Sequence, residues 1–259
     1  MTKIYYFSGT GNSLWSARKI AQVIGESSPE TKCELFNIGI EEKKSEIKIE
    51  ADTVIIIFPS FAYGLPHVVS RFVKKAEFKT QYIAGFTTYG SNPLGTLGVL
   101  QRILKKKTNC KIFFGKIPAV ENYLAMFGTP DKDKIKLWTD MQKKATNEAA
   151  RFVIEKKENI VNTFTPFSSF VSLLFTLGIK IFYKYYRVSD DCNGCGICEK
   201  ICPVSSIRME NKRPVFTSTC EHCQGCVNIC PAKAIQFARK KFGKEGYCHP
   251  EIQIKDLMR

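Results

Sequence analysis

The chain has 259 residues, of which 44% are hydrophobic, and a formal net charge of +15. This length allows one large domain or two smaller ones, and the composition excludes a disordered or fibrous chain. The first residues lack the basic stretch, long apolar core and small-residue cleavage site of a secretory signal, so the cytoplasm is the expected location.

The positive charge is concentrated in the first part of the chain. Residues 1–187 contain 28 basic and 16 acidic residues, which gives +12, whereas the remainder contains 11 and 8, which gives +3. A basic surface attracts nucleic acid, anionic lipid or acidic proteins, but it also simply keeps a protein soluble. We find no arginine–aromatic pattern or zinc-finger spacing that favours nucleic acid.

Strand and helix patterns alternate through residues 1–158. Apolar runs predict strands over 3–7, 33–38, 54–58, 82–88 and 111–117, and helical periodicity follows over 14–24, 68–73, 95–107 and 132–157. The charged stretch 41–50 is expected to be a connection. The alternation predicts an α/β fold with a doubly wound, five-stranded parallel sheet.

Three loops follow predicted strands in this part of the chain. Ligands of doubly wound sheets lie beyond the carboxyl ends of the strands, where the strand order reverses. The candidate cofactor-binding residues are therefore Ser8, Gly9, Thr10, Gly11, Asn12 and Ser13 in the first loop, Pro59, Ser60, Phe61, Ala62, Tyr63 and Gly64 in the second, and Thr87, Thr88, Tyr89, Gly90 and Gly95 in the third.

The first of these loops has the chemistry of a phosphate site. Backbone N–H groups at the start of a helix favour an anion, and the hydroxyl and amide side chains add neutral donors. The loop lacks the lysine of an ATP-binding loop, which suits a phosphate monoester that is held but not transferred. Tyr63 and Tyr89, with Phe61 third, are the expected neighbours of a flat ring. The alternatives are a serine-rich helix cap and ordinary core packing.

Residues 159–187 connect the two halves of the chain. The stretch 159–179 carries no formal charge, which raises the alternatives of a membrane span and of a segment lying on a membrane surface, with Lys180, Lys184 and Arg187 near lipid headgroups. Its polar and proline residues disfavour a span. We expect a linker whose apolar face packs between two domains.

Eight of the eleven cysteines form a repeated pattern in the C-terminal quarter. Each copy has the spacing C-x2-C-x2-C-x3-C-P of bacterial two-cluster ferredoxins. In that arrangement, one [4Fe–4S] cluster is held by Cys192, Cys195, Cys198 and Cys230, and the other by Cys220, Cys223, Cys226 and Cys202. The alternative, structural zinc, does not suit four evenly ordered cysteines plus proline occurring twice. His222, inside the second motif, is expected to be a solvent-facing spacer.

The two halves resemble two known families. Residues 1–158, through YFSGTGNS, resemble flavodoxins, and residues 188–240 resemble a small α+β dicluster ferredoxin, followed by a tail at 241–259. The whole chain is similar to flavodoxin–ferredoxin fusion proteins of anaerobic bacteria and archaea. This resemblance implies FMN, two [4Fe–4S] clusters and low-potential electron transfer. Flavodoxins and ferredoxins are generally acidic, so the basic charge of this chain favours acidic redox partners of ferredoxin or flavodoxin type.

Three functions are compatible with these features. The favoured one is an electron carrier between redox partners, because no protein acids or bases are grouped near the three loops. The alternative is an FMN-dependent reductase in which the clusters supply electrons for reduction of a small molecule. A redox sensor is disfavoured because no DNA-reading motif accompanies the cysteines.

Overall fold

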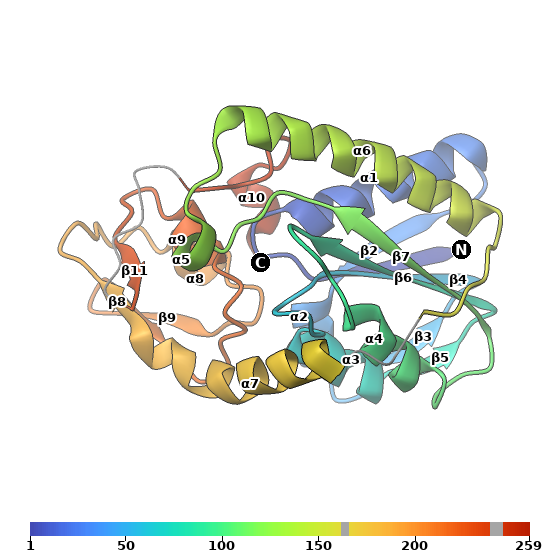
Figure 1. The fold of residues 1–259 in the computed structure, drawn as a ribbon, viewed down its shortest axis with the longest axis horizontal. Coiled ribbons are helices and arrows are strands. Elements are labelled where there is room, and N and C mark those ends of the chain that lie inside the picture. Colours follow the sequence, from blue (N-terminus) through green and yellow to red (C-terminus); the bar gives the residue numbers. More distant parts are fainter. Residues whose placement is uncertain (162–165, 239–245) are drawn as a thin grey trace.

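The computed structural model describes residues 1–161, 166–238 and 246–259. Its centre is a parallel five-stranded sheet with strand order β2-β1-β4-β6-β7 (Figure 1). These strands are Cys33–Asn37, Thr2–Tyr6, Thr53–Pro59, Tyr82–Tyr89 and Lys111–Pro118. The order is that of the flavodoxin-like doubly wound fold, so the predicted fold class is confirmed.

Helices cover both faces of this sheet (Figure 1). One face carries α1 (Asn12–Ser27) and α6 (Lys132–Ile154), and the other carries α2 (Ile38–Glu41), α3 (His67–Lys75) and α4 (Thr96–Leu104). Along β4, Ile55 and Ile57 belong to the core with α1 and α6, whereas Val54, Ile56 and Phe58 belong to the opposite core. The uninterrupted apolar run of β4 therefore reflects burial on both faces.

Residues 41–50 contain more regular structure than a connection. Helix α2 ends at Glu41, and β3 (Lys48–Glu50) pairs in parallel with β5 (Glu77–Lys79) as a separate two-stranded sheet. Strands of three residues are too short to produce a readable alternation, so the charged composition of this stretch concealed β3.

The C-terminal part has the expected small α+β form. Strand β8 (Tyr186–Val188) pairs antiparallel with β11 (Ile235–Phe237), and β9 (Ile207–Glu210) pairs antiparallel with β10 (Arg213–Phe216). Short helices α8 (Ile197–Lys200) and α9 (Gly225–Ile229) begin inside the first and second cysteine motifs respectively.

The segment predicted as a linker contains a helix. Helix α7 (Pro166–Phe182) runs along one side of the molecule from the flavodoxin-like part to the cysteine-rich part, and a 3-10 turn at Tyr183–Tyr185 follows it (Figure 1). Among the residues that the structure describes, no helix is long and apolar enough to cross a membrane.

The two parts of the chain share one continuous interior. The core under α3 and α4 extends without a break to Tyr186, Val204 and Ile235 of the cysteine-rich part. At one point of this junction the backbones meet, because a Cβ atom on Gly39 would lie 1.7 Å from the carbonyl oxygen of Pro203. Only glycine permits this approach.

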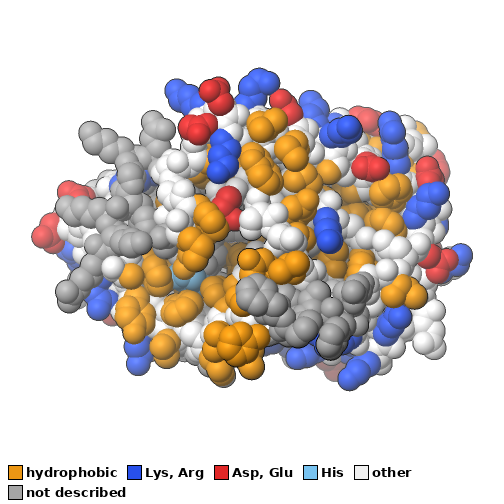
Figure 2. All heavy atoms as spheres, in the orientation of Figure 1, with side chains coloured by type: hydrophobic (Ala, Val, Ile, Leu, Met, Phe, Trp, Pro, Cys, Tyr) orange, Lys and Arg blue, Asp and Glu red, His pale blue; other side chains and the backbone are white. Residues whose placement is uncertain are grey.

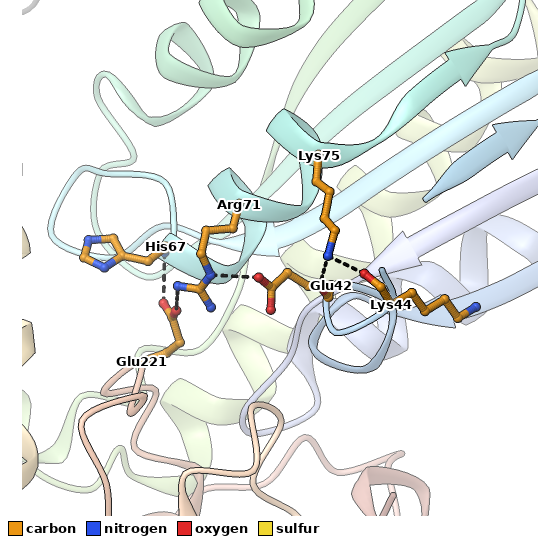
Figure 3. Close-up of polar contacts among 6 residues, drawn as sticks. All are labelled: Glu42, Lys44, His67, Arg71, Lys75 and Glu221. Carbon is orange, nitrogen blue, oxygen red and sulfur yellow. Dashed lines mark hydrogen bonds and ion pairs between the residues drawn. The ribbon is translucent and has the colours of Figure 1, made fainter. Parts of the chain in front are cut away.

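A buried carboxylate from the second cysteine motif reinforces the junction (Figure 3). Glu221 accepts a hydrogen bond from the backbone N–H of His67 at 2.9 Å, at the start of α3, where the helix dipole favours negative charge. Arg71 bridges Glu221 and Glu42. Burial raises the pKa of Glu221 to about 7, although Arg71 and the backbone donors oppose this shift.

We expect the substitution Gly39→Ala to weaken the contact between the two parts of the chain. The added methyl group overlaps the Pro203 carbonyl, so the free energy of unfolding should fall by about 1–3 kcal/mol, as in other overpacked sites. Gly25→Ala is the matched control, since a Cβ atom there meets nothing within 4 Å and an alanine inside α1 should stabilise by about 0.5–1 kcal/mol. Denaturant unfolding of both variants measures the free energy of unfolding. Equal values for the two variants would contradict the close contact at Gly39.

Candidate cofactor site

The three predicted loops meet at the carboxyl ends of β1, β4 and β6, around a cavity of about 480 Å³. This is the size of an ordinary small-molecule site. Of the predicted cofactor residues, thirteen line the cavity: Ser8, Gly9, Thr10, Asn12, Ser13, Pro59, Ser60, Phe61, Ala62, Tyr63, Thr88, Tyr89 and Gly90. Gly11, Gly64, Thr87 and Gly95 do not line it.

The first loop forms a tight turn directly before α1. Gly11 precedes the first residue of α1 with φ of +100°, a conformation that favours glycine. The Gly11 N–H donates to Ser8 Oγ at 3.1 Å, and the hydroxyls of Ser13 and Thr88 lie 2.9 Å apart, so the first and third loops are joined. The amino end of a 16-residue helix therefore faces one end of the cavity.

The second loop is a tight turn with an unusual backbone. Ala62 and Tyr63 have φ of +44° and +65°, between the paired backbones of Phe61 and Gly64. Non-glycine residues in this region cost free energy and concentrate at ligand sites. The turn places the tyrosine and phenylalanine of this loop on the cavity wall.

The other walls come from elements that the sequence analysis did not assign to the site. The loop after β7, helix α5 (Leu124–Phe127), helix α7 and the second cysteine motif all contribute. The additional lining residues include Asn122, Tyr123, Phe127, Phe175, Phe182, His222, Cys223 and Gln224. The loop after β7 could have been predicted, because it also follows a strand of the sheet, but the rest depend on how the two parts associate.

The eight motif cysteines separate into two groups in space. A small cleft is lined by Cys192, Cys195, Cys198 and Cys230. Burial raises the pKa of Cys198 to about 12, and the neighbouring Cys230, Cys195 and Cys192 act in the same direction. The fourth member of this group thus comes from the second motif, as in a ligand exchange between two cubanes.

The second group is more deeply buried. Burial raises the pKa of the Cys223 thiol, and Cys202 and Cys220 add to this shift. Burial also raises the pKa of the Cys226 thiol, and Cys220, Cys223, Cys202 and Cys198 act in the same direction. Because the raised pKa values keep Cys223 and Cys226 protonated without a metal, metal binding displaces these protons. The Cys202 sulfur accepts a hydrogen bond from the backbone N–H of Ser206 at 3.2 Å.

The buried cysteine group borders the phosphate loop directly. A Cβ atom on Gly9 would lie 3.0 Å from the Cys223 carbonyl oxygen and 3.1 Å from its sulfur. A Cβ atom on Gly225 would lie 2.6 Å from the Gly9 carbonyl oxygen. The two loops are therefore in backbone contact, and Cys223 itself lines the large cavity.

His222 is not the solvent-facing spacer that the sequence suggested, because only 2% of its surface is exposed. One ring nitrogen lies 2.8 Å from the Tyr186 hydroxyl and the other lies 3.0 Å from the Tyr123 hydroxyl. Burial lowers the pKa of His222 to about 4, so the ring is neutral, with one donor and one acceptor nitrogen. The side chain thus fixes two tyrosines at the boundary between the cavity and the buried cysteines.

Residues 191–235 match the family model of the 4Fe-4S dicluster domain. This match confirms the prediction of an iron–sulfur domain, and with it a role in electron transfer. No curated protein matches the chain.

The chain also matches solved structures over its first part. They include rubredoxin oxygen:oxidoreductase from Desulfovibrio gigas (17% identity, 59% of this chain and 36% of that one, TM-score 0.37) and Megasphaera elsdenii flavodoxin (17%, 58% and 98%, 0.36). A third is a flavodoxin of Streptococcus pneumonia TIGR4 (12% identity, 60% of this chain and 99% of that one, TM-score 0.37). The chain thus spans about a third of the first of these proteins, and the fold assignment rests on its own strand order.

The fold and the cysteine motifs together define a two-part redox protein, with a flavodoxin-like α/β domain followed by a dicluster iron–sulfur domain. This is the domain order of the flavodoxin–ferredoxin fusion proteins that the sequence resembles.

We expect paired serine substitutions to reveal the exchanged ligands. Cys202→Ser with Cys223→Ser removes two ligands from one group, so about half of the iron should remain. Cys192→Ser with Cys202→Ser removes one ligand from each group, although both residues belong to one motif, and should deplete both clusters. Iron and sulfide analysis with EPR measures this, and Cys248→Ser, outside both groups, is the control. If the first pair instead depletes both clusters and the second pair leaves about half of the iron, each motif holds its own cluster.

Proposed function

We propose that the chain binds FMN in the large cavity and transfers electrons between this flavin and two [4Fe–4S] clusters. When bound, FMN exchanges one or two electrons and each cluster exchanges one. The observation that carries the proposal is the backbone contact between Gly9 of the phosphate loop and the Cys223–Gly225 stretch of the second motif.

The residues of the cavity fit FMN in three respects. The neutral donors of Ser8–Ser13 and the amino end of α1 suit a phosphate group at one end. Aromatic side chains from the second and third loops suit a flat ring. Gln224 lines the cavity, and its Oε1 atom is buried with no hydrogen-bond partner among the described residues, so it can accept a hydrogen bond from a bound molecule.

The exposure of the two cysteine groups supports an order for electron transfer. Cys195 is exposed, and a Cβ atom on the neighbouring Gly196 would meet nothing within 4 Å, so the loop of the first group faces outward. The second group is adjacent to the large cavity, because Cys223 lines it. Electrons from an external protein would enter at the first group, pass to the second and reach the cavity at Cys223.

The net charge supports acidic redox proteins, of ferredoxin or flavodoxin type, as partners. A chain of formal charge +15 steers acidic proteins toward itself over long range and repels basic ones. We favour a carrier that connects such partners.

One observation favours the alternative of an FMN-dependent reductase. The cavity continues beyond the three flavin loops to an apolar wall formed by Phe127, Phe175 and Phe182. Such a wall offers space for a small acceptor beside a bound ring. Turnover with small acceptors at rates that exceed reduction of partner proteins would replace the carrier function with this one.

Anaerobic reconstitution with iron, sulfide and FMN tests the proposal. In the reconstituted protein, the flavin should be reduced after the clusters at a rate that does not depend on protein concentration, because the electron moves within one chain. Cys192→Ser should slow flavin reduction by a protein donor while FMN binding stays unchanged. Failure of the chain to bind FMN, or a rate proportional to protein concentration, would overturn the proposal.

A further inference from the structure

The C-terminal segment 246–259 crosses from the cysteine-rich part to the amino end of α1 (Figure 1). Its side chains of Tyr247, His249, Ile252 and Leu257 are buried, and it ends in the short helix α10 (Ile254–Leu257). The segment is therefore an integral part of the fold, although it follows the last cysteine motif and belongs to neither sequence pattern.

This segment holds the phosphate loop from its outer side. The Tyr247 hydroxyl donates to Asn12 Oδ1 at 2.6 Å, and the His249 backbone N–H donates to the Thr10 carbonyl at 2.9 Å. The His249 ring stacks on Trp15 with centroids 4.9 Å apart. A Cβ atom on Gly11 would lie 3.0 Å from His249 Cβ, so the loop and the segment are in close contact.

The same segment is anchored to both cysteine motifs. The Tyr247 backbone N–H donates to Asn228 Oδ1 at 2.9 Å, and Asn228 lies between Cys226 and Cys230. At the other end, the Arg259 backbone N–H donates to the Lys200 carbonyl at 3.1 Å, between Cys198 and Cys202. The position of the phosphate loop is thus tied to the helices that carry cluster ligands.

We infer that Tyr247 is a positioning residue of the FMN phosphate site. This inference rests on the proposed function. Asn12 lines the cavity at the first residue of α1, and its side chain is held between two groups: Oδ1 accepts from Tyr247, and Nδ2 donates to the Val120 carbonyl at 3.0 Å. With its side chain engaged, the residue keeps the loop in the shape that presents backbone N–H groups to an anion. A loop held in this shape before binding loses less entropy when the phosphate arrives.

The substitution Tyr247→Phe removes only the hydroxyl that fixes Asn12. We expect the Kd for FMN to rise by about five-fold, which is the loss of one net hydrogen bond. FMN titration of the cluster-loaded protein, followed by quenching of flavin fluorescence, measures this change. Tyr185→Phe, at an exposed tyrosine outside the cavity, is the matched control and should leave the Kd unchanged.

A double-mutant cycle separates positioning from general destabilisation. If Tyr247 acts through Asn12, then Tyr247→Phe should have no further effect on the Kd in an Asn12→Ala background. Equal Kd values for wild type and Tyr247→Phe, or additive effects in the double mutant, would overturn the inference. Absence of FMN binding by the wild-type chain would instead overturn the proposed function.

A second inference comes independently from helix α7, whose two faces have different environments. Val171, Phe175 and Phe182 line the large cavity. On the outward face, five large apolar side chains are between 48% and 60% exposed: Phe170, Leu173, Leu174, Leu177 and Ile181. Figure 2 shows apolar side chains gathered along the edge of the molecule where Figure 1 places α7.

The charges around this face select its partner. No acidic residue occurs between Glu158 and Asp190, and the exposed Lys184 and Arg187 follow the helix directly. A helix of 17 residues is about 25 Å long, which is less than the bilayer core, so it suits a position in the membrane interface. The geometry points to docking of α7 on an anionic lipid surface, with the apolar face among acyl chains and the basic residues near headgroups.

Vesicle co-sedimentation of the reconstituted protein tests this docking. We expect binding to phosphatidylcholine vesicles that contain phosphatidylserine, much weaker binding to pure phosphatidylcholine, and loss of binding in Leu174→Glu with Leu177→Glu. Leu137→Glu, at an exposed leucine of α6, is the control. The inference would be overturned if the wild-type protein remains in solution with both kinds of vesicle. It would also be overturned if light scattering shows that the protein forms a dimer through α7.

Discussion

The contact between two glycine-containing loops is the constraint on which the rest of the arrangement depends. Gly9 belongs to the predicted phosphate loop and Gly225 to the second cysteine motif; a Cβ atom on Gly225 would overlap the Gly9 carbonyl, and one on Gly9 would lie tightly against Cys223. Because the two backbones touch, the buried cysteine group forms part of the cavity wall and is not a separate domain at the end of a linker. Cys223 belongs both to the cavity wall and to this cysteine group, so the proposed electron transfer between them would follow a short route.

Several other contacts fix the position of these two loops relative to each other. Glu221 of the second motif binds the start of α3, the carbonyl of Pro203 lies against Gly39, and the C-terminal segment joins the phosphate loop to Asn228. These contacts involve α3, α2 and the amino end of α1, so a rotation of one part against the other would break at least one of them. The continuous apolar core beneath α3 and α4 adds non-directional attraction, which the polar contacts make specific.

Local patterns in the sequence were sufficient to predict the parallel sheet and the iron–sulfur domain. Strand β4 could be predicted because burial on both faces of the sheet excludes polar residues from it. The cysteine motifs could be recognised because iron ligation fixes the spacing of the cysteines. The burial of His222 and the attachment of Tyr247 to Asn12 could not be predicted, because each depends on a partner far away in the sequence that no local periodicity reports. The helix at 166–182 was missed although its apolar residues recur at helical spacing, because the proline and polar residues of this stretch favoured a linker.

The environments of the two cysteine groups also constrain how charge moves through the protein. An added electron increases negative charge, which costs more around the buried Cys202 and Cys226 than near the exposed Cys195. Backbone N–H groups offset part of this cost, such as that of Ser206 at the Cys202 sulfur. We therefore expect an electron to reside more favourably at the outer group and to pass through the inner one. Under the proposed function, the inner group would act as a bridge between a partner at the surface and the cavity.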